Sequence, residues 1–111
     1  MMNENTGELE FICTIIREVF AAEGIPLLRL IFFGSRARGD FLKESDWDFI
    51  AVTGRIVTWE RKKQIWFVIS RKLAVRQLSA DVLVKSEIEF EKDSHDVGKV
   101  TYYAVKEGVV V

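Results

Sequence analysis

The sequence has few of the residues that stabilise small secreted proteins or build compact metal sites. Its one cysteine, Cys13, excludes both a disulfide framework and a cysteine-based metal site within a single chain. Because Cys13 lies among the apolar residues of segment 11–16, we interpret it as a small buried side chain rather than a reactive thiol. The one histidine, His95, lies near a predicted helix start and is interpreted as a solvated or capping residue. Neither residue is placed in a candidate site.

The sequence also lacks long apolar runs and an excess of charge of either sign. Residues 1–10 are polar and acidic, without the apolar core of a secretory signal, and no later run approaches the length of a membrane span. We therefore expect a cytoplasmic protein without a membrane partner. Sixteen Lys and Arg against seventeen Asp and Glu give a formal net charge of -1. This balance argues against extended nucleic-acid binding, although it allows a small local basic patch.

What is present is ordinary globular composition. The chain is 49% hydrophobic and 30% charged, far from the polar, charge-biased makeup of a disordered segment. Its 111 residues are enough to close one core but too few for a second independent one. We predict a single domain over residues 1–111.

The spacing of apolar residues predicts alternating helices and strands. In the first half we expect a helix over 9–20, a strand over 27–33 covered on both faces, a loop over 34–46 that can include one helical turn at 35–38, and a strand over 47–52. In the second half we expect a helix over 59–76 capped by Thr58, a strand over 80–85, a short helix from a capping box at 86–89, a helix over 97–106 capped by Gly108, and the start of a strand over 109–111. This alternation predicts an α/β (α+β) layer with at least some parallel strand pairing.

The helix predicted over 59–76 is apolar on more than one side. Its helical stripe consists of Trp59, Trp66, Ile69 and Leu73. Residues 65–69 form a contiguous apolar run that extends beyond this stripe. The run indicates either that the helix is buried on more than one side or that it offers a surface to a partner. We interpret all three tryptophans, including Trp47, as core rather than ligand-stacking side chains.

Two aspartates stand at the start of the strand over 47–52. Through the two-residue period of a strand, Asp46 and Asp48 share one face with Ile50 and Val52, so the two carboxylates point the same way. Aspartate is depleted in strands, so the presence of two aspartates at this strand start calls for a structural or functional explanation. It is either a solvated strand end or a metal site, since carboxylate oxygens suit Mg²⁺. The pair alone does not decide between the two interpretations.

Gly34 and Ser35 end the preceding strand and favour the metal site. Glycine lets the backbone approach a phosphate, while the N–H and hydroxyl of its neighbour donate to phosphate oxygens. At the carboxyl end of a buried strand, where ligands of open α/β sheets tend to bind, the dipeptide predicts a triphosphate cradle. Asp81, which opens the strand over 80–85, is then the third carboxylate, on a face where it can meet the other two. Two metals bridged by such carboxylates would activate an attacking hydroxyl and stabilise the leaving oxygen.

Two arginines in the same loop are further candidates. Arg36 and Arg38 can clamp phosphates or pyrophosphate, the chemistry that a guanidinium suits. They can equally hold the loop by pairing with Asp40 or Glu44. Both functions stay open, with Arg38 the stronger nucleotide-binding candidate because it precedes the loop glycine.

Three segments resemble the minimal nucleotidyltransferase family of the DNA polymerase β superfamily. They are Gly34-Ser35-Arg36-Ala37-Arg38-Gly39, Ser45-Asp46-Trp47-Asp48 and Asp81-Val82-Leu83-Val84. The signature of that family is Gly-Ser, ten intervening residues and Asp-x-Asp, and residues 36–45 supply the spacing. Residues 102–108 are similar to the closing helix of the family and its Glu-Gly stop. As a joint pattern this resemblance is highly specific.

The resemblance implies a nucleotidyltransferase fold with a mixed sheet of about three or four strands flanked by helices. It implies ATP as the substrate with two Mg²⁺ ions, and transfer of AMP to an acceptor hydroxyl with release of pyrophosphate. Ser35 would bind the terminal phosphates, Asp46 and Asp48 the metals, and Asp81 a metal and the acceptor hydroxyl as base. Many such proteins are similar in role to antitoxins that adenylylate a tyrosine of a partner HEPN-domain toxin.

The sequence and the resemblance are therefore compatible with three functions. The first is adenylyl transfer to a HEPN-domain toxin, giving the chain an antitoxin role. The second is a non-catalytic nucleotide-binding antitoxin that acts by occluding its partner, which the apolar helix over 59–76 suggests. The third is adenylyl transfer to a small molecule such as an aminoglycoside. The length of the chain weighs against the third, because the drug-modifying families carry an added substrate-binding domain.

Overall fold

The computed structural model describes residues 5–111 as one sheet with helices on both faces. In chain order, the described residues form α1 (Asn5–Ala22), β1 (Leu27–Phe33), α2 (Ser35–Arg38), β2 (Trp47–Thr53), α3 (Trp59–Ala74), β3 (Ala80–Ser86), α4 (Glu87–Ser94), α5 (Val100–Glu107) and β4 (Val109–Val110). Residues 1–4 lie outside the described residues. They belong to the predicted domain and to the segment that is predicted to lack a secretory signal. None of the helices in residues 5–111 combines the length and the apolar character needed to cross a membrane.

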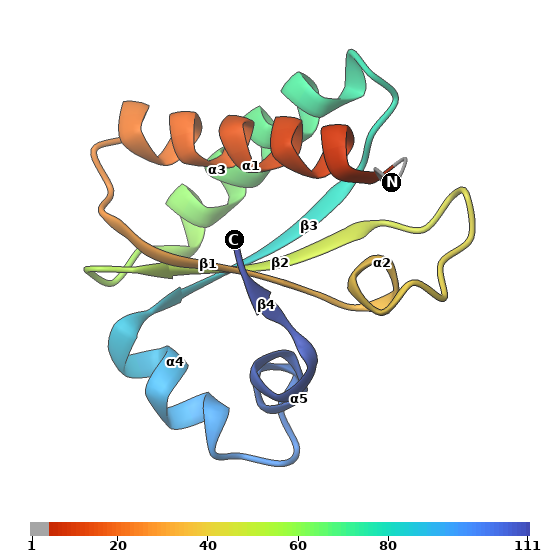
Figure 1. Cartoon of the computed structure of the whole chain (residues 1–111). Helices are drawn as coiled ribbons and strands as arrows, with labels where there is room; N and C mark the ends of the chain where they lie inside the picture. Colours follow the sequence, from red (N-terminus) through yellow and green to blue (C-terminus); the bar gives the residue numbers. More distant parts are fainter. Residues whose placement is uncertain (1–4) are drawn as a thin grey trace.

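The described sheet has four strands in the order β3-β2-β1-β4. β2 and β3 are parallel and are joined through α3, whereas β1 is antiparallel to both β2 and β4. α1 and α3 cover one face of the sheet, and α4 and α5 cover the other (Figure 1). The predicted mixed sheet of three or four strands flanked by helices is confirmed.

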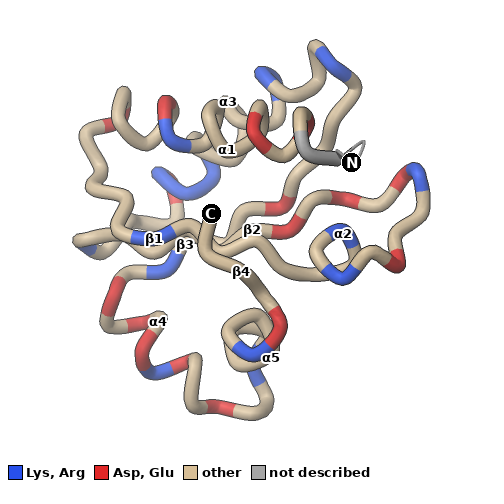
Figure 2. Tube along the Cα trace, in the orientation of Figure 1, with Lys and Arg blue, Asp and Glu red and all other residues tan. Residues whose placement is uncertain are grey.

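The strand directions bring the candidate residues to one edge of the sheet. The carboxyl end of β1 lies beside the amino ends of β2 and β3, because β1 runs opposite to both. In the strand register Phe33 pairs with Asp48, and Asp48 pairs in turn with Asp81. Figure 2 shows the acidic positions that open β2 and β3 close together, with the basic residues of α2 beside them.

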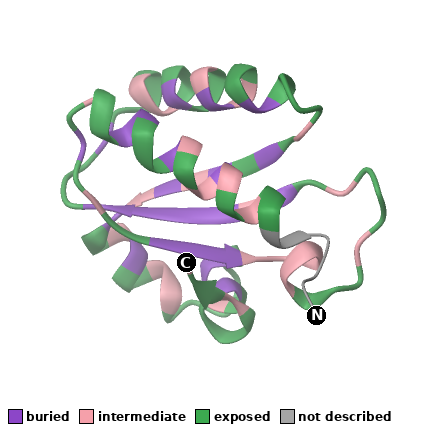
Figure 3. Cartoon of the chain, turned by 45° about the horizontal axis from the view of Figure 1, so that its top comes forward, coloured by how far each residue is buried: buried purple, intermediate pink, exposed green. Residues whose placement is uncertain are grey.

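The core lies on both faces of the central strands. Trp47, Phe49 and Ala51 point into the larger apolar cluster, which α1 and α3 complete. Ile50 and Val52 point into a smaller cluster with residues of α4 and α5. Figure 3 shows the central strands buried between helices whose outer faces are exposed. The alternation along β2 therefore places Asp48 on the face of Ile50 and Val52, as the two-residue period predicts.

Two helix starts confirm the predicted caps. The Thr58 hydroxyl accepts a hydrogen bond from the Arg61 N–H at 3.3 Å and begins α3. At α4 the Ser86 hydroxyl accepts from the Glu89 N–H, while the Glu89 carboxylate accepts from the Ser86 N–H at 2.8 Å. These bonds satisfy backbone donors that the first turn of a helix leaves unpaired.

Three details of the predicted fold are wrong. Trp59 and Trp66 are 66% and 51% exposed, because the buried face of α3 is formed by Ile65, Ile69 and Leu73 instead. β1 is continuously buried only at residues 30–32, since Leu28 and Arg29 in its first half are exposed. The last helix begins at Val100 rather than at residue 97, because the Asp96 carboxylate accepts a bond from the Gly98 N–H and forms a turn first.

Candidate functional site

Gly34 and Asp48 are in direct contact at the edge of the sheet. Gly34 has φ 83° and ψ -166°, a conformation that is essentially restricted to glycine. A Cβ at this position would lie 2.3 Å from Asp48 Oδ2, well inside van der Waals contact. The glycine therefore serves two purposes: it turns the chain out of β1, and it leaves room for the Asp48 carboxylate beside the backbone.

α2 follows Gly34 as a single tight turn. The Arg38 N–H donates to the Gly34 carbonyl at 3.0 Å, and the Gly39 N–H donates to the Ser35 carbonyl at 2.8 Å. Gly39 ends the turn in the left-handed region at φ 90°. The turn confirms the predicted helical turn at residues 35–38 and holds the partly exposed Ser35 directly after the Asp48 contact. A hydroxyl at this place can donate to an anion at the edge of the sheet.

The three aspartates stand on adjacent strand ends. Asp48 and Asp81 are partners in the parallel register, so their side chains start on the same face of neighbouring strands. Asp46 lies just before β2, and its Oδ1 accepts a hydrogen bond from the Ser79 hydroxyl. The Trp47 N–H also donates to the Ser79 carbonyl, at 3.0 Å. Ser79 thus fixes the segment that carries Asp46 against the segment that leads to Asp81.

The pKa of Asp48 is affected by burial and by the neighbouring charges. Burial is the main cause that raises the pKa of Asp48, and the negative charges of Asp81 and Asp46 raise it further. The positive charge of Arg38 acts in the opposite direction. A carboxylate that burial and two like charges destabilise gains the most from a cation beside it. The charges of Asp46 and Asp81 therefore act on the Asp48 carboxylate, and a cation bound beside it would offset them.

The donor set fits Mg²⁺ completed by a substrate. Among residues 5–111, no three His, Cys, Asp or Glu side chains are gathered into a group that could hold a metal ion. Mg²⁺ does not need such a cage, because proteins usually bind it through one or two carboxylates together with substrate phosphates. The all-oxygen chemistry of the three aspartates and the open backbone at Gly34 meet that requirement. Which oxygens contact a metal stays a prediction.

Arg36 ties the loop after α2 to the sheet. Its guanidinium donates to the carbonyls of Lys43 at 2.9 Å and Ser45 at 3.2 Å. It also lies over the rings of Phe41 at 4.2 Å and Trp47 at 4.8 Å. These contacts hold the loop through its backbone carbonyls. A phosphate-binding role for Arg36 stays a prediction.

Arg38 connects the site to the last helix. Its guanidinium makes ion pairs of 3.3 Å with Asp40 and with Glu107 of α5. The pairing with Asp40 is one of the two loop contacts expected from the sequence. The positive charge of Arg38 also lowers the pKa of Asp48. A phosphate-binding role for Arg38 stays a prediction.

The sequence analysis did not identify two residues that contribute to the site, Ser79 and Glu107. Ser79 is an ordinary residue of the loop before β3, and its bond to Asp46 becomes visible only in the fold. Glu107 is 69 positions from Arg38 along the chain. A Ser directly before a strand that carries a site carboxylate is the one hint that could have pointed to Ser79.

The two single-copy residues lie outside this cluster. Cys13 is partly buried in α1, and burial raises the pKa of its thiol. The thiol therefore ionises less readily to the reactive thiolate. His95 follows α4, is exposed, and pairs with Glu91 at 3.2 Å. Neither takes part in the candidate site, in agreement with their interpretation from the sequence.

Comparisons with known proteins identify the family and support the fold. The family model of the nucleotidyltransferase domain matches residues 12–109. A crystal structure of a provisionally assigned nucleotidyltransferase from Sulfolobus solfataricus is similar with a TM-score of 0.53 and 28% sequence identity. The similarity covers 87% of this chain and 72% of that one. A search of the curated proteins found no match.

Proposed function

The chain belongs to the nucleotidyltransferase domain family, and from that premise we propose that it transfers AMP from ATP to a tyrosine hydroxyl of a partner HEPN-domain protein. Nucleotidyl transfer in general follows from the family and the similar crystal structure. The choice of ATP, of a tyrosine acceptor and of an antitoxin role is supported by the resemblance of the three sequence segments to the minimal nucleotidyltransferases.

One observation supports the proposed chemistry more than any other. The Asp48 carboxylate lies against the Gly34 backbone, with Asp81 beside it in register and Asp46 two residues away. A phosphate-sized turn and an anionic cluster that favours a cation are therefore next to each other. This is the combination that a triphosphate with its metal requires.

Each residue of the site would have a role in the reaction that follows from its chemistry. Ser35, which follows the Gly34 turn, would donate to the terminal phosphates of ATP, and Arg38 would add positive charge on that side. Asp46 and Asp48 would hold the metal, and Ser79 keeps Asp46 oriented for it. When bound, Mg²⁺ would offset the negative charge of the triphosphate and of the departing pyrophosphate.

The reaction is an in-line displacement at the α-phosphorus of ATP. The acceptor oxygen forms a bond to that phosphorus, and the bond from the phosphorus to the oxygen shared with the β-phosphate breaks. Pyrophosphate leaves with the electron pair of the broken bond. Asp81, exposed at the start of β3, would accept the proton of the acceptor hydroxyl as general base. The products are an AMP ester of the acceptor and pyrophosphate.

A labelling experiment tests the proposal. The chain and a co-expressed HEPN-domain partner are incubated with ATP labelled at the α-phosphate and with Mg²⁺. We expect label on a tyrosine of the partner from the wild type and none from Asp46→Ala/Asp48→Ala. The exposed loop substitution Glu44→Ala serves as the matched control and should leave labelling unchanged. Absence of label on any tyrosine with wild-type protein would refute the proposed acceptor.

A second candidate is a non-catalytic role in which the chain occludes its partner. The observation that favours it is the exposed outer surface of α3, where Trp59, Trp66 and Phe67 are each at least half exposed. If Asp46→Ala/Asp48→Ala neutralises the partner as well as the wild type does, occlusion is the function. If the double variant still binds but no longer neutralises, transfer is the function.

A further inference from the structure

β3 is the edge strand of the described sheet beside α3. It pairs with β2 on one side and, within residues 5–111, has no strand neighbour on the other. A groove of about 450 Å³ lies along this edge. Its lining comes from α3 and from β3, and consists of Trp59, Lys62, Lys63 and Trp66 together with residues 82–85.

The backbone of β3 presents hydrogen-bonding groups to this open side. The carbonyl of Ser79 accepts from Trp47 at 3.0 Å, and that of Lys85 accepts from the Thr53 hydroxyl at 3.4 Å, so both point toward β2. The strand has a two-residue period. Val82 and Val84 therefore direct their N–H and C=O groups away from β2, toward the open edge.

β3 also lacks the features by which proteins usually protect an exposed edge. It is seven residues long, contains no proline and keeps a continuous register with β2. Its one lysine, Lys85, forms an ion pair of 2.7 Å with Asp93 of α4. By contrast β4, at the other edge, has only two residues. A long, regular edge with an apolar centre, here residues 82–84, invites pairing with another chain unless a partner covers it.

The charge beside the groove selects the kind of partner. Residues 59–76 contain six Lys and Arg and one Glu, although the whole chain has a net charge of -1. Among the described residues, the ion pair of Lys62 is a long contact of 3.9 Å with Glu89. Lys63 lies over the Trp59 ring at 4.7 Å and makes no ion pair among the described residues. An acidic partner is therefore favoured, and a second copy is disfavoured because it would bring a second set of the same basic side chains to the shared edge.

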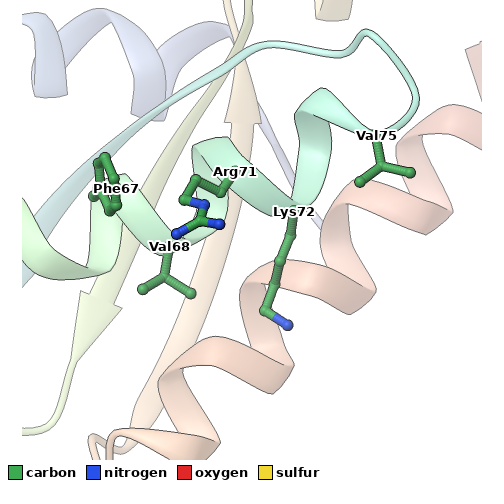
Figure 4. A pocket seen from close by; sticks show the side chains of 5 residues that line it. All are labelled: Phe67, Val68, Arg71, Lys72 and Val75. Carbon is green, nitrogen blue, oxygen red and sulfur yellow. The ribbon is translucent and has the colours of Figure 1, made fainter.

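The opposite flank of α3 offers less to a chain segment. A hollow of about 360 Å³ there is lined by Phe67, Val68, Arg71, Lys72 and Val75. All five side chains project from α3, with α1 running alongside (Figure 4). No strand edge contributes to this hollow, so it presents no open row of backbone donors and acceptors.

We propose that the β3 edge binds an extended acidic segment of a partner protein as an added strand. Its backbone would pair with Val82 and Val84, and its acidic side chains would meet Lys62 and Lys63. Its apolar side chains would cover Trp59 and Trp66. This inference concerns how a partner is held, and it does not depend on the reaction proposed above.

The test uses a synthetic probe and the intrinsic fluorescence of the tryptophans, without ATP. The probe is a blocked octapeptide of alternating Val and Glu; a Val/Lys peptide and an N-methylated Val/Glu peptide without backbone donors are its comparisons. Trp59 and Trp66 are exposed and Trp47 is buried, so binding at the groove should shift the emission to the blue. We expect the Val/Glu peptide to bind at least about tenfold more tightly than either comparison.

Variants of the chain locate the binding. Lys62→Glu/Lys63→Glu should reverse the preference toward the Val/Lys peptide, whereas Lys43→Glu/Lys106→Glu makes the same charge change at exposed positions away from the groove and should not. Equal binding of the Val/Glu and Val/Lys peptides, equal binding of the N-methylated peptide, or no binding at millimolar concentration would overturn the proposal. So would a β3-paired dimer of this chain, detected by light scattering and disrupted by Val84→Pro. None of these outcomes bears on the labelling experiment.

Discussion

Gly34 is the residue on which the geometry of the site depends most directly. In Gly34→Ala, the new Cβ would meet Asp48 Oδ2 at 2.3 Å, so the carboxylate has to move. We expect nucleotidyl transfer to fall by about 100-fold or more, equivalent to about 2.7 kcal/mol of transition-state stabilisation. Release of labelled pyrophosphate under saturating ATP measures the loss.

Gly39→Ala separates this contact from backbone strain. Gly39 also has a positive φ, 90°, but a Cβ added there would meet no atom of the described residues within 4 Å beyond its neighbours in the chain. The substitution should cost about 1 kcal/mol of folding stability through strain, with a much smaller effect on transfer. If Gly39→Ala loses as much activity as Gly34→Ala, strain in the turn rather than displacement of Asp48 is the cause.

Asp48 makes the stability of the metal-free protein depend on pH. Because its pKa is raised in the folded state, the folded protein holds this proton to higher pH than the unfolded chain does. The contribution of Asp48 to stability is therefore greatest below the ordinary carboxyl pKa of about 4 and falls as the pH rises through the folded pKa of this group. We expect Asp48→Asn to be more stable than the wild type at pH 7, with the difference disappearing below about pH 4.

Denaturant unfolding in the presence of a chelator measures this difference at each pH. Glu44→Gln, in the exposed part of the loop, is the matched removal of one carboxylate charge and should give no comparable gain. An Asp48→Asn protein that is less stable than the wild type at pH 7 would show that the contacts of the carboxylate outweigh its desolvation and charge repulsion.

At the scale of the elements, α4 depends on its capping box. Ser86→Ala removes the hydroxyl that accepts from the Glu89 N–H, and it leaves that donor without its partner. We expect a loss of about 1 kcal/mol in the free energy of unfolding. Ser94→Ala, at the exposed end of the same helix, removes a hydroxyl that donates to Glu91 and should cost clearly less. Equal losses would mean that the cap is not what stabilises the helix start.

The loop between α2 and β2 depends on Arg36 in a comparable way. Arg36→Ala removes the donors to the Lys43 and Ser45 carbonyls and the contact with the Trp47 ring. We expect faster amide hydrogen exchange over residues 40–46, while exchange in β1 and β2 stays slow. Unchanged exchange in the loop would show that other contacts hold it in place.

At the scale of the whole molecule, substrate and metal should stabilise the fold together. A ligand that binds only the folded state raises stability by about 2.7 kcal/mol at a hundred times its dissociation constant. We expect ATP with Mg²⁺ to raise the Tm of the wild type but not that of Asp46→Ala/Asp48→Ala, with Glu44→Ala responding like the wild type. Equal shifts in the double variant would place the binding elsewhere.

The order and type of the elements could be predicted from the sequence because the local signals agree with the fold. The two-residue period of β2, the caps at Thr58 and Ser86, and the single turn at residues 35–38 all appear as expected. The wrong positions of Trp59 and Trp66 have a physical cause. The sequence of a helix that is apolar on two sides does not reveal which side packs against the sheet. The large apolar area of the two tryptophans favours the core, but the structure leaves both side chains exposed.

The position of the candidate site depends on the direction of β1 relative to β2. The sequence predicts a cradle at the carboxyl end of β1, and if the two strands were parallel, Asp48 at the amino end of β2 would lie at the opposite edge of the sheet. It is the antiparallel pairing of β1 with β2 that places Phe33 opposite Asp48. Strand direction is a property of the whole sheet, so no local pattern around Gly34 could have shown it.

That antiparallel pairing also has a kinetic consequence. β1, the following loop and β2 form one hairpin over residues 27–53, so Gly34 and Asp48 meet through a short loop closure. Hairpins form in about 1–10 μs, whereas β3 has to wait for the longer crossover through α3. We expect substitutions in the hairpin to give higher φ-values for folding than substitutions in β3. The phosphate-binding half of the site would then exist before Asp81 arrives to complete it.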